Sequence, residues 1–241
     1  MTAGPVPRES GPVLGLIPAK GGSTRLPRKN VLPLGGRPLM AWAAEAARAS
    51  GVIDRLVVST EDEEVAAIAL DLGLDVPFRR PVELARDPAG VVDVALHALA
   101  ELAAAGHEYR TLVLMTPTCP FVTAEDVRAA FELFVTRHAS FLMSVSPFPH
   151  TPFAALRLDG EGFLSPCFPE YIGRKSQQMP PAVRCNGALH VLDVEAFRRE
   201  RSYYAQPLVG YVMPLERSVD IDTAADLEEA ELRLVKQERL R

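Results

Sequence analysis

The stretch from Leu14 to Leu39, "LGLIPAKGGSTRLPRKNVLPLGGRPL", joins an apolar run to a loop with two adjacent glycines and four cations before Asn30. The apolar run has strand length and little polar character, as expected for a parallel strand that helices cover on both faces. Gly21 and Gly22 allow the backbone to turn its amides toward an anion. We therefore predict an anion-binding loop, with a polyphosphate as its ligand and with positive charge from Lys20, Arg25, Arg28 and Lys29.

The following segments alternate apolar runs of strand length with longer helical patterns. Pro38 and Gly51 mark the start and end of one helix, and Thr123 is a typical N-cap for another. This βαβα alternation predicts an α/β fold with a doubly wound, Rossmann-like and mostly parallel sheet. Strands are expected at residues 13–19, 54–60, 109–117 and 140–147, and helices at residues 38–51, 61–73, 89–106 and 123–138.

The alternation stops after residue 147. Residues 148–187 are rich in proline, glycine and aromatic side chains, with a hairpin pattern around the Asp159-Gly160 turn. We interpret this segment as a loop-rich insertion within one domain. The core pattern returns with strands at 188–197 and 208–214 and an amphipathic helix at 223–240. Residues 1–12 are expected to form a flexible tail, which leaves residues 13–241 as a single domain.

Composition excludes several classes of protein. A length of 241 residues suits one sizeable α/β core, and a formal net charge of −5 argues against a nucleic-acid surface. No apolar run reaches the roughly 18 residues that a membrane span requires. The first twelve residues lack the apolar segment of a secretory signal, and the three cysteines show no metal-site or disulfide spacing. We therefore expect a cytoplasmic protein with no membrane or nucleic-acid partner.

A second motif, "RSVDIDTAADL", places Asp220 and Asp222 on either side of Ile221. In an extended segment this spacing puts both carboxylates on the same side, where they can bind Mg²⁺ together with substrate phosphates. The alternative is that Asp222 caps the following helix, and for the pair alone that reading is the better one. The loop taken alone is equally well read as a solvated turn. Together the two motifs favour a nucleotidyltransferase site.

The loop differs from two well-known phosphate motifs. It contains no G-x-G-x-x-G and does not end in G-K-[ST], so neither a dinucleotide fingerprint nor a P-loop is present. Gly35 and Gly36 lie too late and predict a separate turn. A nicotinamide-dependent oxidoreductase is therefore disfavoured. A binding module that has lost catalysis is a second alternative, although a pure binder has little need of a carboxylate pair.

Six segments, taken in order, resemble the motifs of the acylneuraminate cytidylyltransferases, the CMP-sialic acid synthetase family. They are "IPAKGGSTRLPRKN", "VVSTEDEEVA", "PFRRPVELARD", "MTPTCPF", "QQMPPAVRCNGALHVLD" and "SVDIDTAADL". Six motifs in order are far more specific than any one of them. The resemblance implies a nucleotide-diphospho-sugar transferase-type fold and a homodimer whose arm is the insertion. It also implies Mg²⁺-dependent transfer from CTP to an acidic 2-keto sugar, with release of pyrophosphate.

The resemblance also implies roles for individual residues. Lys29, Lys20 and Asp222 are the catalytic candidates, and Asp220 and Asp222 are the candidate Mg²⁺ ligands. The expected nucleotide-binding residues are Ala19, Gly21, Gly22, Ser23, Arg25, Asn30 and Arg80. The expected sugar-binding residues are Thr116, Gln178, Arg184 and Asn186.

Three positions depart from the family pattern. Lys20 stands where the family usually has arginine, which keeps the charge but loses the bidentate fork. Thr24 replaces a usual lysine, with Arg25 beside it, and Thr116 replaces a glutamine that reaches the sugar. The segment after Asp87, "PAGVVD", lacks the small hydroxyl residues usual near the base. The sugar acid (sialic, legionaminic, pseudaminic or octulosonic) and the nucleotide (CTP or GTP) therefore stay open.

Overall fold

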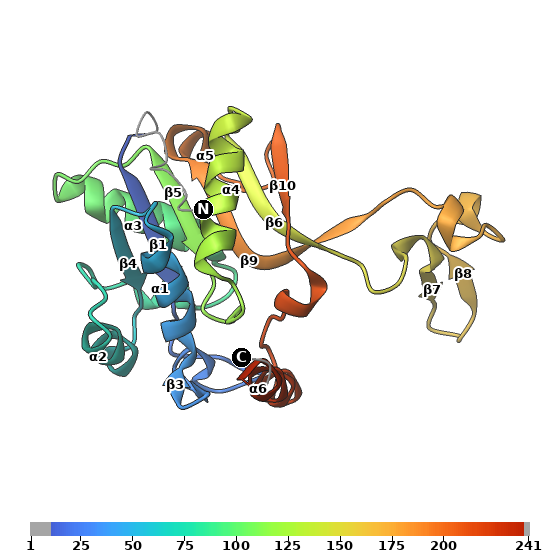
Figure 1. The fold of residues 1–241 in the computed structure, drawn as a ribbon, viewed down its shortest axis with the longest axis horizontal. Helices are drawn as coiled ribbons and strands as arrows, with labels where there is room; N and C mark the ends of the chain where they lie inside the picture. Colours follow the sequence, from blue (N-terminus) through green and yellow to red (C-terminus); the bar gives the residue numbers. More distant parts are fainter. Residues whose placement is uncertain (1–10, 239–241) are drawn as a thin grey trace.

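The computed structural model describes residues 11–238, so most of the tail expected at residues 1–12 lies outside the described residues. Its centre is a six-stranded sheet in the order β10-β6-β9-β5-β1-β4 (Figure 1). Neighbouring strands of this sheet are parallel except for β9, which is antiparallel to β5 and to β6. The prediction of a mostly parallel sheet is confirmed. The strands are β1 (Val13–Pro18), β4 (Arg55–Ser59), β5 (Thr111–Met115), β6 (Phe141–Pro147), β9 (Val183–Asp193) and β10 (Leu208–Val212).

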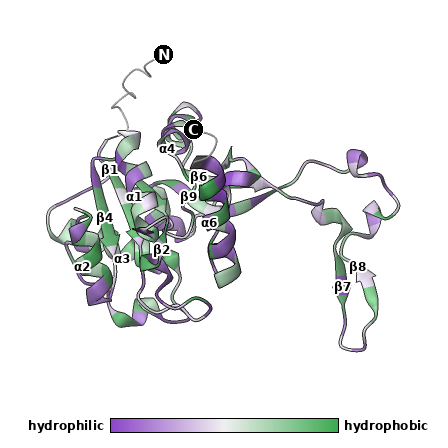
Figure 2. Ribbon diagram, turned by 60° about the horizontal axis from the view of Figure 1, so that its bottom comes forward, coloured by the Kyte–Doolittle hydropathy of each residue, from purple (hydrophilic) through white to green (hydrophobic). Residues whose placement is uncertain are grey.

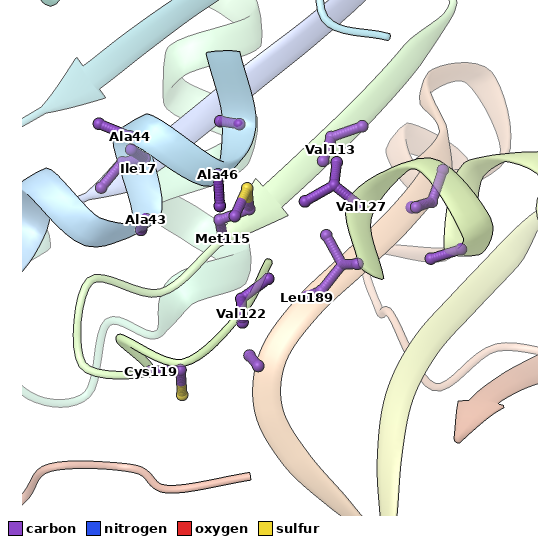
Figure 3. Close-up of a cluster of buried hydrophobic side chains, with 14 of the residues drawn as sticks. Ile17, Ala43, Ala44, Ala46, Val113, Met115, Cys119, Val122, Val127 and Leu189 are labelled. Carbon is purple, nitrogen blue, oxygen red and sulfur yellow. The ribbon is translucent and has the colours of Figure 1, made fainter. Parts of the chain in front are cut away.

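Helices cover both faces of the sheet because the central strands are apolar on both sides. In β1, Leu14 and Leu16 pack into the cluster that contains α3 and α5, whereas Ile17 packs into the cluster that contains α1, α2 and α4. Figure 3 shows the second of these clusters, where Ile17, Val113 and Leu189 face alanines of α1 and Val127 of α4. The helices are α1 (Leu39–Ser50), α2 (Glu63–Asp71), α3 (Val91–Ala104), α4 (Ala124–Thr136), α5 (Val194–Glu200) and α6 (Ala224–Glu238).

Several local signals act as the sequence predicts. Gly35 and Gly36 both have positive φ and form the predicted separate turn. This turn joins the short strands β2 (Pro33–Leu34) and β3 (Arg37–Pro38). Gly51 ends α1 in the left-handed region. Thr123 caps α4 through a reciprocal pair of hydrogen bonds with Asp126. None of the described helices is both long and apolar enough to cross a lipid bilayer.

The prediction of a strand over residues 188–197 is wrong at both ends. β9 starts earlier, at Val183, because Val183 and Arg184 pair with the end of β6 although their side chains are exposed. It ends at Asp193, whose carboxylate accepts a hydrogen bond from the backbone N–H of Ala196 at 2.8 Å and caps α5. The periodicity of a short apolar run does not distinguish a strand from a helix. Here the cap at Asp193 sets the boundary between β9 and α5.

The segment before β9 forms an arm, defined here as residues 148–182. It contains the hairpin of β7 (Leu156–Leu158) and β8 (Leu164–Pro166) and projects away from the sheet (Figures 1 and 2). The hairpin turns at the predicted Asp159-Gly160 dipeptide, where the Asp159 carboxylate accepts backbone hydrogen bonds. The large apolar side chains exposed on the arm are Leu156, Leu158, Phe163, Leu164 and Ile172.

Candidate active site

The loop that follows β1 is held against the end of β4. The backbone N–H of Gly21 donates to Glu61 Oε1 at 2.8 Å, and a Cβ on Gly21 would lie only 2.2 Å from Asp62 Oδ2. Only glycine fits this approach. The sequence predicts that the Gly21 amide turns toward an anion. In the structure this amide donates to a protein carboxylate instead. Gly22 next to it has open space around its Cα.

The cations of the loop divide into two groups. Lys29 Nζ lies 2.7 Å from Asp222 Oδ1, and an Arg25 guanidinium nitrogen lies 2.7 Å from Asp222 Oδ2. Arg28 instead pairs with Asp62 at 3.3 Å and with Glu64 at 2.8 Å. Burial raises the pKa of Asp222, but the hydrogen bond and charge of Lys29 and the charge of Arg25 outweigh it, so that the pKa is lowered.

Asp220 and Asp222 lie in an irregular segment and not in a strand, but the predicted alternation holds. Ile221 between them is fully buried, and its N–H donates to the carbonyl of Thr118 at 2.9 Å. The cap of α6 is Thr223, whose hydroxyl accepts from the N–H of Asp226 at 3.3 Å, so the Asp222 carboxylate does not cap. The Asp222 carboxylate faces the loop instead, so the alternative that Asp222 caps the following helix is wrong.

Asp220 keeps contact with solvent, and its pKa shifts in the opposite direction to that of Asp222. Burial raises its pKa, and the negative charge of Asp222 adds to this, although a hydrogen bond from Thr118 and the charge of Lys29 oppose the shift. Within residues 11–238 no three His, Cys, Asp or Glu side chains gather as a metal site would require. The protein can thus offer a cation two carboxylates, which is the usual protein contribution to a Mg²⁺ site that substrate phosphates complete.

A cavity of about 240 Å³ opens at the carboxyl ends of β1 and β5. Asn30 is buried and donates from Nδ2 to the carbonyl of Lys20 at 2.8 Å. Arg80 is only 3% exposed and forms an ion pair with Glu61. A narrow apolar slot with a few fixed polar groups is suited to a planar heterocycle. The polar lining is Lys20, Lys29, Asn30, Arg80, Thr116 and Thr118, and the apolar lining includes Leu84, Ala85, Val91 and Val94.

A smaller cavity of about 70 Å³ lies beside the first, and Lys20 and Lys29 line both. Its other walls include Ser23, Arg25 and Asp222. The Ser23 hydroxyl is buried and has no hydrogen-bond partner among the described residues. A buried hydroxyl in this position is available to a bound group. Lys20 and Lys29 thus connect the apolar slot of the first cavity to the smaller, polar cavity.

A third cavity of about 600 Å³ lies on the other side of Asp220. Arg184 at the exposed start of β9 lines it, as do Tyr204 and Arg233, which the sequence did not single out. Neither Tyr204 nor Arg233 belongs to a motif with chemical spacing, so no signal in one sequence could have found them. The carboxylate pair therefore lies between two cavities of different size.

Asn186 also reaches this cavity, but its amide is occupied within the protein. Oδ1 accepts from Ser144 Oγ at 2.6 Å, and Nδ2 donates to Ser218 Oγ at 2.9 Å. These bonds sit where the register between β6 and β9 shifts, and they hold the segment that leads into Asp220. Asn186 thus shapes the wall of the cavity and has its polar atoms already engaged.

Three other predicted residues lie elsewhere. Thr116 lines the cavity of about 240 Å³ and not the third one, and its hydroxyl donates to the carbonyl of Gly187 at 2.5 Å. Ala19 is buried and extends the β1–β4 pairing through its N–H to Ser59. Gln178 lies on the arm, where its side chain accepts from the N–H of Lys175 at 3.1 Å. One chain does not bring Gln178 together with the other candidates.

The chain matches known proteins in sequence and in fold. A family model described as cytidylyltransferase matches residues 14–145. The chain is 30% identical to the pseudaminic acid cytidylyltransferase of Campylobacter jejuni, over 90% of this chain and 94% of that protein. It is 31% identical to the CMP-N,N'-diacetyllegionaminic acid synthase of Legionella pneumophila, over 89% and 92% of the two chains.

The fold is similar to that of a solved CMP:2-keto-3-deoxy-manno-octonic acid synthetase complexed with CTP. The TM-score is 0.71 at 16% sequence identity, over 94% of this chain and 99% of that one. This likeness confirms the predicted nucleotidyltransferase-type α/β fold. The family model and the two relatives confirm the resemblance that the six motifs indicate. The chain therefore belongs to the cytidylyltransferase family and is a nucleotidyltransferase.

Proposed function

We propose that the protein transfers the cytidylyl group of CTP to an acidic 2-keto sugar of the nonulosonic type. The sugar's anomeric hydroxyl forms a bond to the α-phosphorus, the bond to the β-phosphate oxygen breaks, and the hydroxyl loses its proton as pyrophosphate leaves. The observation that carries this proposal is the position of Asp222. Its carboxylate meets Lys29 and Arg25 in the smaller cavity, two residues from Asp220, which lines the larger one. The names of both curated relatives specify products of this class.

The nucleotide would occupy the first two cavities. The base would enter the apolar slot beside Asn30 and Arg80, and the phosphates would lie along Lys20 and Lys29 toward Ser23. Phosphoryl transfer needs alignment and charge neutralisation more than covalent assistance. A lysine that is only 18% exposed, as Lys29 is, can supply that charge without strong screening by solvent.

The sugar acid would occupy the third cavity. Its volume of about 600 Å³ accommodates a nine-carbon sugar, and Arg184 supplies positive charge for a carboxylate, whereas Arg233 is paired with Glu229 at 2.6 Å. Asp220 lines this cavity, which brings the acceptor close to the carboxylate pair. Gln178 would take part only if a second copy of the chain brought its arm to this site.

Asp220 and Asp222 would hold Mg²⁺. The raised pKa of Asp220 fits this assignment because a partly desolvated carboxylate beside a second negative charge is stabilised by a bound cation. Mg²⁺ bound there would neutralise negative charge on the α-phosphate. Lys29 and Arg25 now hold Asp222, so nucleotide phosphates would compete with that carboxylate for the same two cations.

We also propose that the protein is a homodimer. The arm exposes Leu158 and Phe163 at 66% and 68%, together with three further large apolar side chains. Several large apolar side chains exposed on one short segment are typical of an interaction site. A second copy that covers the arm would bury these side chains.

The test is pyrophosphate release with Mg²⁺, in which CTP, GTP, UTP and ATP are each combined with nonulosonic and 3-deoxy-octulosonic acids. We expect release with CTP and one nonulosonic acid, and none after chelation of Mg²⁺. Release with GTP, or with an octulosonic acid, would assign the same chemistry to another substrate pair. Nucleotide binding without turnover on any acid would instead identify a binding module.

A further inference from the structure

Glu61 connects two parts of the site that are far apart in the sequence. It follows β4 and precedes α2, and its side chain is 12% exposed. Oε1 accepts the N–H of Gly21 at 2.8 Å, and Oε2 accepts from Arg80 Nε at 3.1 Å and from a second guanidinium nitrogen. One carboxylate thus binds the phosphate loop on one side and a wall of the nucleotide cavity on the other.

The charge of Glu61 is required by Arg80. A guanidinium that is 3% exposed needs a counter-charge, because burial of an unpaired charge is strongly unfavourable. Burial raises the pKa of Glu61, but the hydrogen bonds from Arg80 and Gly21 and the charge of Arg80 together hold it below its ordinary value. The pair is therefore ionised at neutral pH, and the charge of Arg80 is already balanced before a nucleotide binds.

Asp62 holds the other end of the same loop. Its carboxylate accepts the N–H of Val65 as the cap of α2 and pairs with Arg28 at 3.3 Å. Arg28 has φ of 56°, a conformation that an L-residue adopts only when its surroundings enforce it. Two consecutive acids thus hold the loop at residues 21 and 28, immediately before Lys29.

On the basis of the proposed function, we propose that Glu61 is a positioning residue for the nucleotide. It does not line the cavities and acts through Gly21 and Arg80. It fixes the phosphate loop and the nucleoside wall relative to each other, so that CTP meets a preorganised site. Loss of this link would weaken nucleotide binding and leave the sugar cavity unchanged, since that cavity shares no residue with Glu61 or its partners.

The test uses four variants: Glu61→Gln, Arg80→Gln, the double variant, and Glu63→Gln as a control. Glu63 is the exposed neighbour that pairs with exposed Arg79. We expect Glu61→Gln to raise KM for CTP by about tenfold or more, with KM for the sugar acid changed less than about twofold. Glu63→Gln should change neither. Because Glu61 acts partly through Arg80 and partly through Gly21, the double variant should bind CTP more weakly than Arg80→Gln alone, but by less than the product of the two single losses.

Two outcomes would overturn the inference. One is a KM for CTP in Glu61→Gln equal to that of the control, and the other is an equal loss for both substrates accompanied by a fall in Tm. If Glu61→Gln does not fold, Glu61→Asp decides: it keeps the charge but is one carbon shorter, so a normal KM for CTP would refute the role. Wild-type protein that binds no nucleotide would refute the proposed function itself, independently of these variants.

Discussion

The loop from Lys20 to Asn30 and the arm from 148 to 182 are both irregular segments that leave the same sheet, yet they are completed differently. The loop finds its partners within the chain: Gly21 and Arg28 bind acids after β4, and Lys29 binds Asp222. The arm leaves large apolar side chains exposed. The comparison teaches that the loop is preorganised by contacts within one chain, whereas the arm leaves an apolar surface that the proposed second copy would cover.

The strongest way to break this comparison is to remove the residue on which the loop converges. We expect Asp222→Ala to lower kcat by about a thousandfold, because it removes a proposed Mg²⁺ ligand and the partner of Lys29. Its Tm should change by less than about 3 °C, since Asp222 is 30% exposed and ion pairs that keep contact with solvent contribute little to stability. Pyrophosphate release and thermal unfolding measure the two effects.

Thr223→Ala is the matched control, because Thr223 is the cap of α6. It should cost about 1 kcal/mol of stability and keep most of the activity. The reverse pattern, in which Asp222→Ala unfolds easily and Thr223→Ala loses turnover, would restore the capping interpretation of Asp222.

The two cations on Asp222 offer a finer comparison. The Lys29 side chain is 18% exposed and that of Arg25 is 67% exposed, although both lie 2.7 Å from the same carboxylate. We expect Lys29→Ala to lower kcat by about a hundredfold, because charge in a half-buried site acts more strongly on the transition state. Arg25→Ala should cost less than about tenfold because solvent screens its charge. Steady-state kinetics at saturating CTP compares them, and equal losses would show that exposure does not separate their roles.

The arm is tested by placing charge on its apolar surface. Leu158→Asp and Phe163→Asp change side chains that are exposed in one chain, so the fold should be kept while the dimer dissociates. Sedimentation velocity measures the assembly. Calorimetry should find CTP affinity within about twofold of wild type, since the loop is complete without the arm. Leu232→Asp on α6, at a position that is 73% exposed, should leave the dimer intact. A dimer that survives both arm substitutions would refute the role of the arm.

Sequence reasoning succeeded where the signals are local. The cap at Thr123 and the alternation around Ile221 depend on neighbouring residues, and both patterns predicted the observed structure. It failed where partners are distant. The Gly21 amide is taken up by Glu61, 40 residues away, and the amide of Asn186 by Ser144 and Ser218. No periodicity in one sequence records such pairings.

The same limit explains the errors at β9. Its first residues are exposed and paired, so they lack the apolar run that identifies a strand, and its end is set by the side chain of Asp193. Gln178 lies on the arm, inside the predicted insertion, whereas the later residues of its motif lie in β9. A motif gives the order of residues along the chain. It does not show which of those residues lie in the same cavity of one folded chain.

The smallest expected effect is a change of stability with pH. It concerns β9, which is exposed where it meets the arm and buried at its other end. His190 is 5% exposed, stacks on Tyr203 at 4.6 Å, and has no hydrogen-bond partner for either ring nitrogen among the described residues. Burial lowers its pKa to about 4. Between that value and about 6.5, the unfolded chain binds a proton that the folded chain does not, so stability falls as pH falls through this window.

From pH 7 to pH 5 we expect His190 to cost about 2 kcal/mol of unfolding free energy, an order-of-magnitude figure from this single titration. Urea unfolding of wild type and His190→Leu at both pH values isolates the effect, because groups elsewhere titrate alike in the two proteins. His150→Leu is the control, since His150 is exposed at the start of the arm. If wild type and His190→Leu lose the same stability on acidification, then His190 gains a proton in the folded state, and the core end of β9 admits water as its exposed end does.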